Sequence, residues 1–170
     1  MDAQVTFRQA DERDLDLLVE LFDGVARWMV SGGIEQWKPG ARGAGHFRAR
    51  IAEGEVWLAA REGRTLGAYE LWWEDREVWG EQPPVAGYVH RLMTDREAAP
   101  AGTGRLLLAH AEGRIAAGGR TLARLDCEER NPRLGTYYRA AGYEAVAPPL
   151  VKTGADGRTY AVTRMEKAVG

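Results

Sequence analysis

Residues 92–107, with the sequence LMTDREAAPAGTGRLL, decide the fold. An apolar segment ends at Thr94, Pro100 and two glycines follow, and a helical pattern begins near Gly104. This order predicts a strand, a turn and a helix. Because a helix N-terminus has unpaired N–H groups and a partial positive charge, glycines there let several donors approach an anion. The stretch therefore predicts an anion-binding turn, and the alternative is a tight turn without a ligand.

The turn differs from two common phosphate-binding motifs. No Lys-Ser/Thr pair follows Gly102 and Gly104 to reach a terminal phosphate and hold magnesium, as a P-loop requires. A dinucleotide fingerprint needs three spaced glycines and an acidic residue about 20 positions later, and the sequence lacks that pattern. Neither motif describes this turn.

The residues before the turn predict a strand, two helices and a β-hairpin. A strand at 5–8 is followed by acidic residues and by a helix that ends near Ser31, with a buried stripe formed by Leu15, Leu18, Leu21, Phe22, Val25 and Met29. A second helix is predicted over 44–53. Strands at 56–60 and 65–73 flank a turn at 62–64. Residues 74–84 are expected to form a connecting loop.

The second half of the chain predicts alternating strands and helices. A strand at 85–93 precedes the turn, and a helix with one apolar face runs from Gly104 to Ile115, with His110 and Glu112 expected toward solvent. A strand at 121–127 and a helix from Asn131-Pro132 to Gly142 follow. A closing hairpin pairs 143–146 with 160–165 around a turn at 154–157. The order predicts a mixed α/β sheet with a parallel crossover in its second half.

Composition narrows the class of protein. A chain of 170 residues with 45% hydrophobic content predicts a single domain over residues 1–170. With 23 basic and 25 acidic residues, no nucleic-acid or membrane partner is expected. Cys127 is the single cysteine and is expected in the core, while His46, His90 and His110 lack metal-ligand spacing, so no metal is expected. The N-terminus shows no signal-peptide pattern, and a cytoplasmic location is expected.

The motifs together resemble a known family. The strand end at Leu92-Met93-Thr94, the turn from Ala99 to Gly104, the following helix and strand, and the segment from Asn131 to Tyr143 resemble the GNAT superfamily of acyl-CoA-dependent N-acetyltransferases. The resemblance implies an α/β (α+β mixed) fold in which a central twisted mixed sheet of about seven strands is flanked by about four helices. It also implies acetyl-CoA (coenzyme A) as the cofactor.

The resemblance implies where the cofactor binds. The family turn Gln/Arg-x-x-Gly-x-Gly/Ala wraps the CoA pyrophosphate with backbone amides and falls here on 99–104, with Ala99 in place of Gln or Arg. The strand end pairs with the pantetheine arm, and Asn131, which would also suit a helix cap, matches a position that often contacts the cofactor. The implied cofactor contacts are Leu92, Met93, Thr94, Ala99, Pro100, Ala101, Gly102, Thr103, Gly104, Arg105, Asn131 and Tyr138.

Catalytic roles follow from the same resemblance. Tyr138 matches the tyrosine that protonates the leaving thiolate, a task that suits a phenol still carrying its proton at pH 7; a core aromatic is the alternative. His90 matches the second of two histidines that help remove protons in arylalkylamine N-acetyltransferases, and Tyr88 stands at the first. Glu70 and Asp126 are rival bases, and a buried, locally bonded histidine is the alternative for His90.

The sequence therefore leaves two functions open. The first is transfer of an acetyl group from acetyl-CoA to a primary amine of a small molecule or peptide, by direct attack in a ternary complex between the strand ending at Thr94 and the strand at 121–127. Trp37, Glu70, Trp72 and Trp73 are candidates for the acceptor side, although Trp37 would equally pack over the core. The second is a non-catalytic acyl-CoA-binding sensor or interaction module, which Ala99 and the incomplete histidine pair keep open. Edge strands in the terminal hairpin would permit a homodimer.

Overall fold

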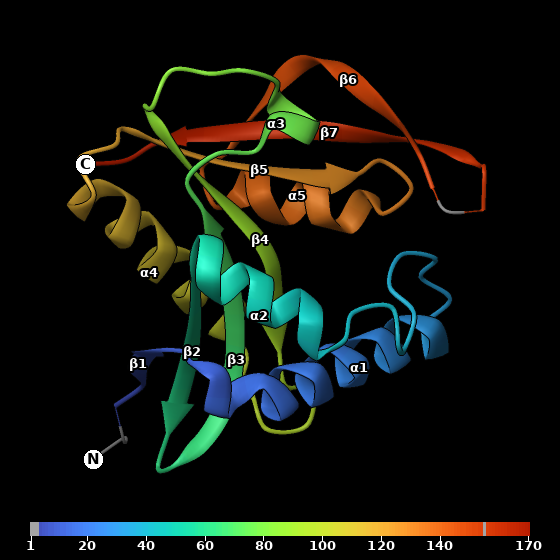
Figure 1. The fold of residues 1–170 in the computed structure, drawn as a ribbon. Helices are drawn as coiled ribbons and strands as arrows, with labels where there is room; N and C mark the ends of the chain where they lie inside the picture. Colours follow the sequence, from blue (N-terminus) through green and yellow to red (C-terminus); the bar gives the residue numbers. More distant parts are fainter. Residues whose placement is uncertain (1–3, 155) are drawn as a thin grey trace. The chain divides into compact units, whose positions relative to one another are not determined.

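The computed structural model describes residues 4–154 and 156–170, which form two compact units (Figure 1). The first unit comprises the described residues up to Trp72 together with Val89–Ala111, and the second comprises Trp73–Tyr88 and the described residues from Glu112 onward. Strand β4 (Ala86–Thr94) and helix α4 (Thr103–Ala117) each pass from one unit into the other. The single domain over 1–170 stays a prediction.

The first unit contains the helices and the hairpin expected before the glycine turn. Its elements are β1 (Thr6–Gln9), η1 (Glu12–Asp14), α1 (Leu15–Ser31), α2 (Ala44–Glu53), β2 (Glu55–Arg61), β3 (Arg64–Trp72), the end of β4 and the start of α4. Strands β1, β2 and β3 are antiparallel neighbours. The predictions for this half are confirmed to within one or two residues at each boundary.

The core of the first unit lies between the helices and the strands. The apolar stripe of α1 is buried, apart from the half-buried Leu21, and packs with Phe47 of α2 and with inward-facing residues of the strands. The strand residues of this cluster are Val56, Leu58, Ala68 and Met93. The helical spacing of the stripe and the alternation along the strands therefore bury one face of each element.

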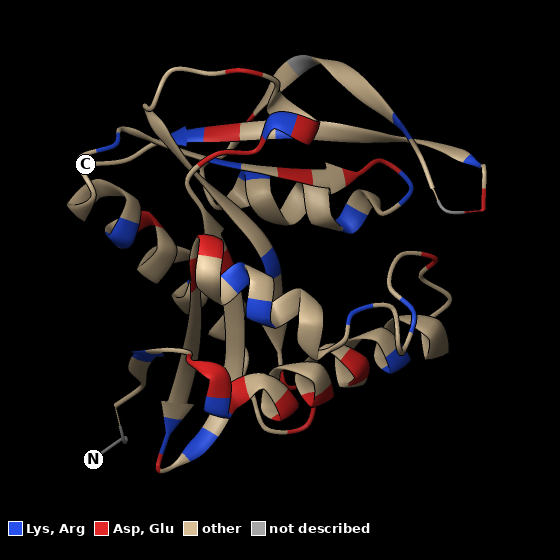
Figure 2. Ribbon diagram, in the orientation of Figure 1, with Lys and Arg blue, Asp and Glu red and all other residues tan. Residues whose placement is uncertain are grey.

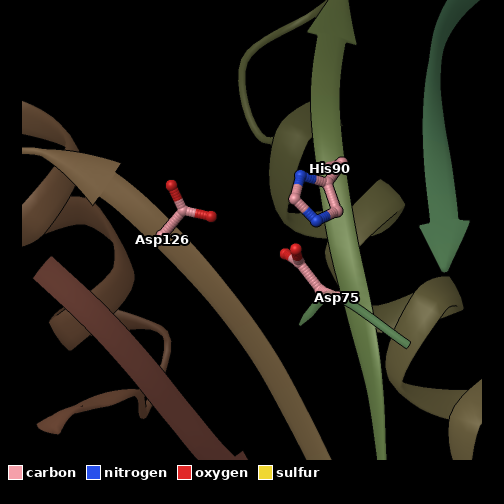
Figure 3. Close-up of side chains that lie close together, drawn as sticks. All are labelled: Asp75, His90 and Asp126. Carbon is pink, nitrogen blue, oxygen red and sulfur yellow. The ribbon is translucent and has the colours of Figure 1, made fainter. Parts of the chain in front are cut away.

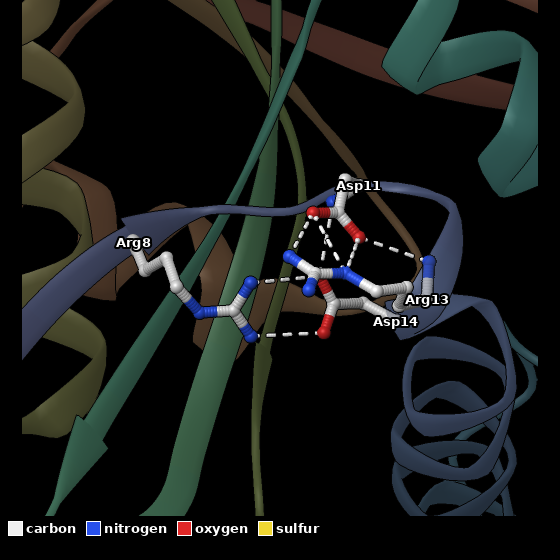
Figure 4. Close-up of polar contacts among 4 residues, drawn as sticks. All are labelled: Arg8, Asp11, Arg13 and Asp14. Carbon is white, nitrogen blue, oxygen red and sulfur yellow. Dashed lines mark hydrogen bonds and ion pairs between the residues drawn. The ribbon is translucent and has the colours of Figure 1, made fainter.

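A polar cluster holds the start of α1 to β1 (Figure 4). Arg8 donates two hydrogen bonds to the carboxylate of Asp14, at 2.9 and 2.8 Å, and Asp11 and Asp14 form a capping box. The hydrogen bonds from Arg8 lower the pKa of Asp14 even though partial burial opposes the shift. This acidic stretch thus fixes where the first helix begins.

The second unit is built on a mixed sheet. Its elements are α3 (Arg76–Trp79), the start of β4, the end of α4, β5 (Leu122–Glu128), α5 (Pro132–Ala140), β6 (Glu144–Thr153) and β7 (Thr159–Ala168). Strand β4 pairs with β5 in parallel, and β7 is antiparallel to both β5 and β6. The predicted parallel crossover and the closing hairpin are present, but the first strand of the hairpin, predicted at 143–146, continues to Thr153. In the predicted turn at 154–157, Ala155 lies outside the described residues.

The described residues form seven strands in the order β1-β2-β3-β4-β5-β7-β6, together with five α-helices. This agrees with the mixed α/β class and with the expected strand number. Basic residues (blue) and acidic residues (red) both occur in each of the two units (Figure 2). None of the helices in the described ranges combines the length and apolar character needed to cross a membrane.

Three expectations are wrong. The loop predicted at 74–84 contains helix α3, because the Asp75 side chain accepts a hydrogen bond from the N–H of Val78 and caps a turn that buries Trp79. His110 does not face solvent but is hydrogen-bonded to the Tyr69 hydroxyl at 2.6 Å. Glu112 accepts hydrogen bonds from the Tyr143 hydroxyl at 2.8 Å and from Lys167 Nζ at 2.9 Å. Helical periodicity missed both because their partners lie 31 to 55 residues away.

Gly67 of β3 provides a test of the packing in the first unit. A Cβ at this position would lie 2.4 Å from the Met93 carbonyl oxygen and 3.0 Å from Leu107 Cδ1. We expect Gly67→Ala to lower the free energy of unfolding by about 1–3 kcal/mol in urea denaturation, because backbone must move. The control is Gly113→Ala within α4, where nothing lies within 4 Å and a gain of about 0.5–1 kcal/mol is expected. Equal stability of Gly67→Ala and the wild type would contradict the packing.

Candidate functional site

The segment between β4 and α4 forms the predicted strand, turn and helix. Asp95 accepts hydrogen bonds from the N–H groups of Glu97 and Ala98, and α4 begins at Thr103, whose hydroxyl donates to the Pro100 carbonyl at 2.7 Å. Gly102 has φ 91°, a left-handed conformation that favours glycine. Helix α4 therefore begins directly after an exposed, glycine-containing loop, and a helix N-terminus in such a place can offer N–H groups to an anion.

The strand that leads into this turn, β4, contains one residue with a positive φ, Arg91. Arg91 has φ 46°, a conformation that non-glycine residues rarely adopt, and it directly precedes Leu92, Met93 and Thr94. Its guanidinium donates to Glu70 Oε1 at 3.0 Å. Such strain persists only where surrounding contacts hold it, and this ion pair is one of them. The end of β4 thus departs from regular extended backbone where the resemblance places the cofactor arm.

Glu70 is a fully buried charged residue of the first unit. It lies on β3 with 0% of its side chain exposed and accepts hydrogen bonds from Trp72 Nε1 at 3.0 Å, Arg91 Nη1 at 3.0 Å and His46 Nε2 at 2.7 Å. Burial alone would raise the pKa of Glu70, but the His46 hydrogen bond and the Arg91 charge lower it below its usual value. Glu70 is therefore a carboxylate at neutral pH.

His90 and Trp72 lie beside this carboxylate. The His90 ring stacks on the Trp72 ring with 3.8 Å between centroids, and the Arg50 guanidinium lies 4.0 Å from the Trp72 centroid. His90 is half-buried. Sequence reasoning selected Glu70, His90 and Trp72, and the first unit brings them together. It missed His46 and Arg91, because their connection to Glu70 spans 24 and 21 residues.

Tyr138 occupies a different environment, in the second unit. It lies on α5, and its ring packs edge-on against Tyr137 and Tyr143, with centroids 5.4 and 6.0 Å away. Burial of the phenol raises the pKa of Tyr138, so the hydroxyl keeps its proton at neutral pH. No hydrogen-bond partner for this hydroxyl is found among the described residues. The hydroxyl therefore keeps its proton, and the ring is held in place by packing against Tyr137 and Tyr143.

Asn131 and Cys127 lie near the start of α5 in sequence. Asn131 is buried at the predicted N-cap position, with Pro132 at the start of the helix, but its side chain makes no capping hydrogen bond. Cys127 is buried on β5, and burial raises the pKa of its thiol to about 11. Cys127 therefore serves as core filling, as expected, because a thiol with that pKa carries little thiolate at pH 7.

Two carboxylates of the second unit lie close together (Figure 3). The side-chain oxygens of Asp75, which precedes α3, and Asp126, on β5, come within 4.8 Å of each other. Asp126 was a rival base in the sequence reasoning, whereas Asp75 was missed, although an aspartate at the start of a short helix is an N-cap signal. His90, drawn in the same figure, belongs to the first unit.

The tryptophans expected on the acceptor side have separate environments. Trp37 stacks on Phe22 of the α1 stripe at 5.0 Å and is half-buried, in agreement with packing over the core. Trp72 belongs to the Glu70 cluster. Trp73 belongs to the second unit, where the Arg120 guanidinium lies 5.0 Å from its ring centroid. Of this set, Trp72 alone is bonded to a candidate catalytic residue among the contacts described above.

Comparison with known proteins identifies the family. A family model described as an acetyltransferase (GNAT) domain matches residues 26–166. The chain belongs to this GNAT acetyltransferase family. Comparison with curated proteins gives no match.

Solved GNAT structures share the fold over nearly the whole chain. A GNAT family acetyltransferase from Listeria monocytogenes is 24% identical with a TM-score of 0.77, and 99% of each chain is covered. PaiA N-acetyltransferase from Thermoplasma acidophilum, solved in complex with coenzyme A, is 19% identical with a TM-score of 0.70, over 97% of this chain and 99% of that one. YncA, a putative acetyltransferase from Salmonella typhimurium solved with acetyl-CoA, is 16% identical with a TM-score of 0.70, over 99% and 95%. At these identities the likeness concerns the fold.

The buried carboxylate predicts a pH-dependent stability. Glu70→Gln should lower the free energy of unfolding at pH 7 by about 2–3 kcal/mol, because Arg91, whose side chain is 16% exposed, loses its counter-charge. Since the folded-state pKa of Glu70 is lowered, its contribution is present above the ordinary value of 4.5 and is lost as the pH falls through the folded pKa. The difference between wild type and variant in urea denaturation should therefore shrink below pH 4.5. A constant difference would show that the charge does not matter.

Proposed function

We propose that this GNAT protein is an N-acetyltransferase that moves an acetyl group from acetyl-CoA to a primary amine of a small molecule or peptide. The observation that carries the proposal is the turn between β4 and α4, with Gly102 at φ 91° and the N-terminus of α4 directly after it. Family membership supports the reaction class. Two GNAT proteins of the same fold were solved with acetyl-CoA or coenzyme A.

The proposed cofactor contacts are mostly backbone groups. Backbone N–H groups within residues 101–105 would bind the pyrophosphate, with Pro100 shaping the turn, since Ala99 lacks the side chain that Gln or Arg offers and the turn is exposed. Leu92, Met93 and Thr94 would pair with the pantetheine arm as a strand does. Asn131, buried but not engaged in capping α5, is a further proposed contact.

The proposed chemistry is a direct transfer without a covalent enzyme intermediate. The lone pair of the free amine attacks the thioester carbon, a C–N bond forms, and the C–S bond breaks with its electron pair on sulfur. The thiolate takes the proton of Tyr138, whose raised pKa keeps that proton available at pH 7. Solvent returns a proton to Tyr138, and the nitrogen releases its surplus proton to a base, for which His90 and Glu70 are the candidates carried over from the sequence.

The cofactor prediction concerns the turn. Acetyl-CoA should raise the melting temperature of the wild type. In Gly102→Val, a β-branched side chain must adopt a left-handed backbone, and we expect the acetyl-CoA Kd from calorimetry to rise about tenfold or more. Gly119→Val is the matched control, because Gly119 also has φ 80° but lies at the other end of α4. An unshifted melting temperature in the wild type, or equal Kd values for the two variants, would refute the proposed turn.

The catalytic prediction concerns Tyr138. Release of free thiol from acetyl-CoA is measured with spermidine, tyramine, kanamycin, alanine and a peptide N-terminus as acceptors. With the best acceptor, Tyr138→Phe should lower kcat by about 10²-fold and leave the acetyl-CoA Kd unchanged, because the lost group is a proton donor. Tyr137→Phe is the matched control on α5. An unchanged kcat in Tyr138→Phe would remove Tyr138 from the mechanism, whereas binding without thiol release for any acceptor would favour the sensor.

A further inference from the structure

We propose that His46 is the base that removes the proton from the acceptor amine, and that Glu70 is the positioning residue that orients it. The inference rests on the proposed function, because a base has a role only if an amine is acetylated. Under this proposal His46 takes the proton and Glu70 does not. His46 was not a candidate from the sequence, and Glu70 was expected to act directly.

The geometry of the pair defines the state of His46. Its Nε2 lies 2.7 Å from Glu70 Oε2, and the Glu70 carboxylate, with its lowered pKa, can only accept at this contact. Nε2 must therefore carry the proton, which leaves the lone pair of the neutral imidazole on Nδ1. The His46 side chain is 20% exposed. In the part of the chain that the structure describes, no hydrogen-bond partner is found for Nδ1.

The surroundings hold the pair in place. Phe47, the next residue of α2, is fully buried in the core, and its ring meets the His46 ring edge-on at 5.0 Å. Glu70 Oε1 is already engaged by Trp72 and Arg91, so Oε2 is the oxygen left for His46. A carboxylate on the far nitrogen fixes the tautomer and stabilises the imidazolium that forms on proton uptake. Glu70 itself has little freedom to accept a proton directly.

The His46–Glu70 pair also lies beside the residues proposed to contact the pantetheine arm, within the first unit. Arg91, which is bonded to Glu70, is followed in β4 by Leu92, Met93 and Thr94, the proposed contacts of the pantetheine arm. The groups that face the pair are Arg50, over Trp72, and His90, stacked on Trp72. A base at His46 would therefore act near the end of that arm, where the thioester must lie if the cofactor follows β4.

Comparison of the three histidines favours His46. His110 is hydrogen-bonded to Tyr69, and its ring stacks on Phe7 with 3.9 Å between centroids. His90 lies flat against Trp72. Among the described residues, the Nε2 of His46 is bonded to a buried carboxylate, and no hydrogen-bond partner is found for its Nδ1. That arrangement supports a base in the way a carboxylate–histidine pair does in other enzymes.

The proton balance is as follows. His46 Nδ1 takes one proton from the ammonium of the acceptor and passes it to solvent. The free amine then attacks, the C–N bond forms and the C–S bond breaks, and the thiolate takes its proton from Tyr138. The second proton of the nitrogen returns through solvent to Tyr138. The net products are the acetamide, CoA thiol and one released proton.

The test uses His46→Gln with His110→Gln as the matched control. With the best acceptor of the wild type, kcat/KM for the amine in His46→Gln should fall about 10²-fold at pH 7, with an unchanged acetyl-CoA Kd and little change in His110→Gln. The deficit should shrink as the pH rises from about 7 to about 9.5, because free amine then forms without a base. Imidazole added to His46→Ala should restore part of the activity. Glu70→Gln should lose activity similarly if it folds.

The other outcomes separate the two proposals. Wild-type turnover with an unimpaired His46→Gln overturns the role of His46 and leaves the acetyltransferase in place. A deficit in His46→Gln that is constant with pH and is not rescued by imidazole also overturns it, since that is the signature of a structural histidine. A larger loss in His90→Gln than in His46→Gln assigns the base to His90. Binding of acetyl-CoA by the wild type without thiol release for any acceptor overturns both proposals.

Discussion

The cost of burying the Glu70 carboxylate constrains the first unit more than any other single feature. A fully buried charge is tolerated only when hydrogen bonds and counter-charges replace water. Here the replacements come from α2, from β3 itself and from β4, through His46, Trp72 and Arg91. One carboxylate thereby ties a helix to two strands and holds Arg91 at its positive φ. The contacts that offset the cost of burying this carboxylate also fix the orientation of the His46 imidazole and of the end of β4 beside the glycine turn.

Burial acts on the two candidate proton-handling groups in opposite directions. Desolvation is the main cause that raises the pKa of Tyr138, and the nearby Asp126 charge raises it further, so the phenol keeps its proton. Glu70 is buried too, but its paired donors outweigh desolvation and lower its pKa. The direction of each pKa shift therefore depends on the groups around the side chain and not only on how deeply the side chain is buried. This difference suits the proposed roles, in which Tyr138 keeps its proton and the Glu70 carboxylate stays charged and orients His46.

Local patterns in the sequence predicted the elements well, because periodicity and capping act over one or two turns of chain. The α1 stripe, the 44–53 helix and the Asn131-Pro132 start of α5 all depend on neighbours within a few residues. The predictions that failed concern residues whose partners are far away in the sequence. His110 with Tyr69, Glu112 with Lys167 and His46 with Glu70 are pairs separated by 24 to 55 residues, and their polar side chains look like solvent-facing residues until the fold brings them together. A candidate cofactor turn was therefore readable from sequence, whereas the partner of Glu70 was not.

Ala99 stands where the family turn has Gln or Arg, and hydrogen bonds around the turn explain how it forms without that side chain. A side chain at that position can support the loop, but the loop here has supports of its own: the Asp95 carboxylate bonds the N–H groups of Glu97 and Ala98, and the N–H of Asp95 donates to the Leu66 carbonyl at 2.8 Å. The Thr103 hydroxyl closes the other end on Pro100. Since these bonds run through backbone groups and two short side chains, the turn keeps its shape without Gln or Arg. The proposed anion binding then depends on the backbone conformation at Gly102 and on the N-terminus of α4, where side-chain chemistry contributes least.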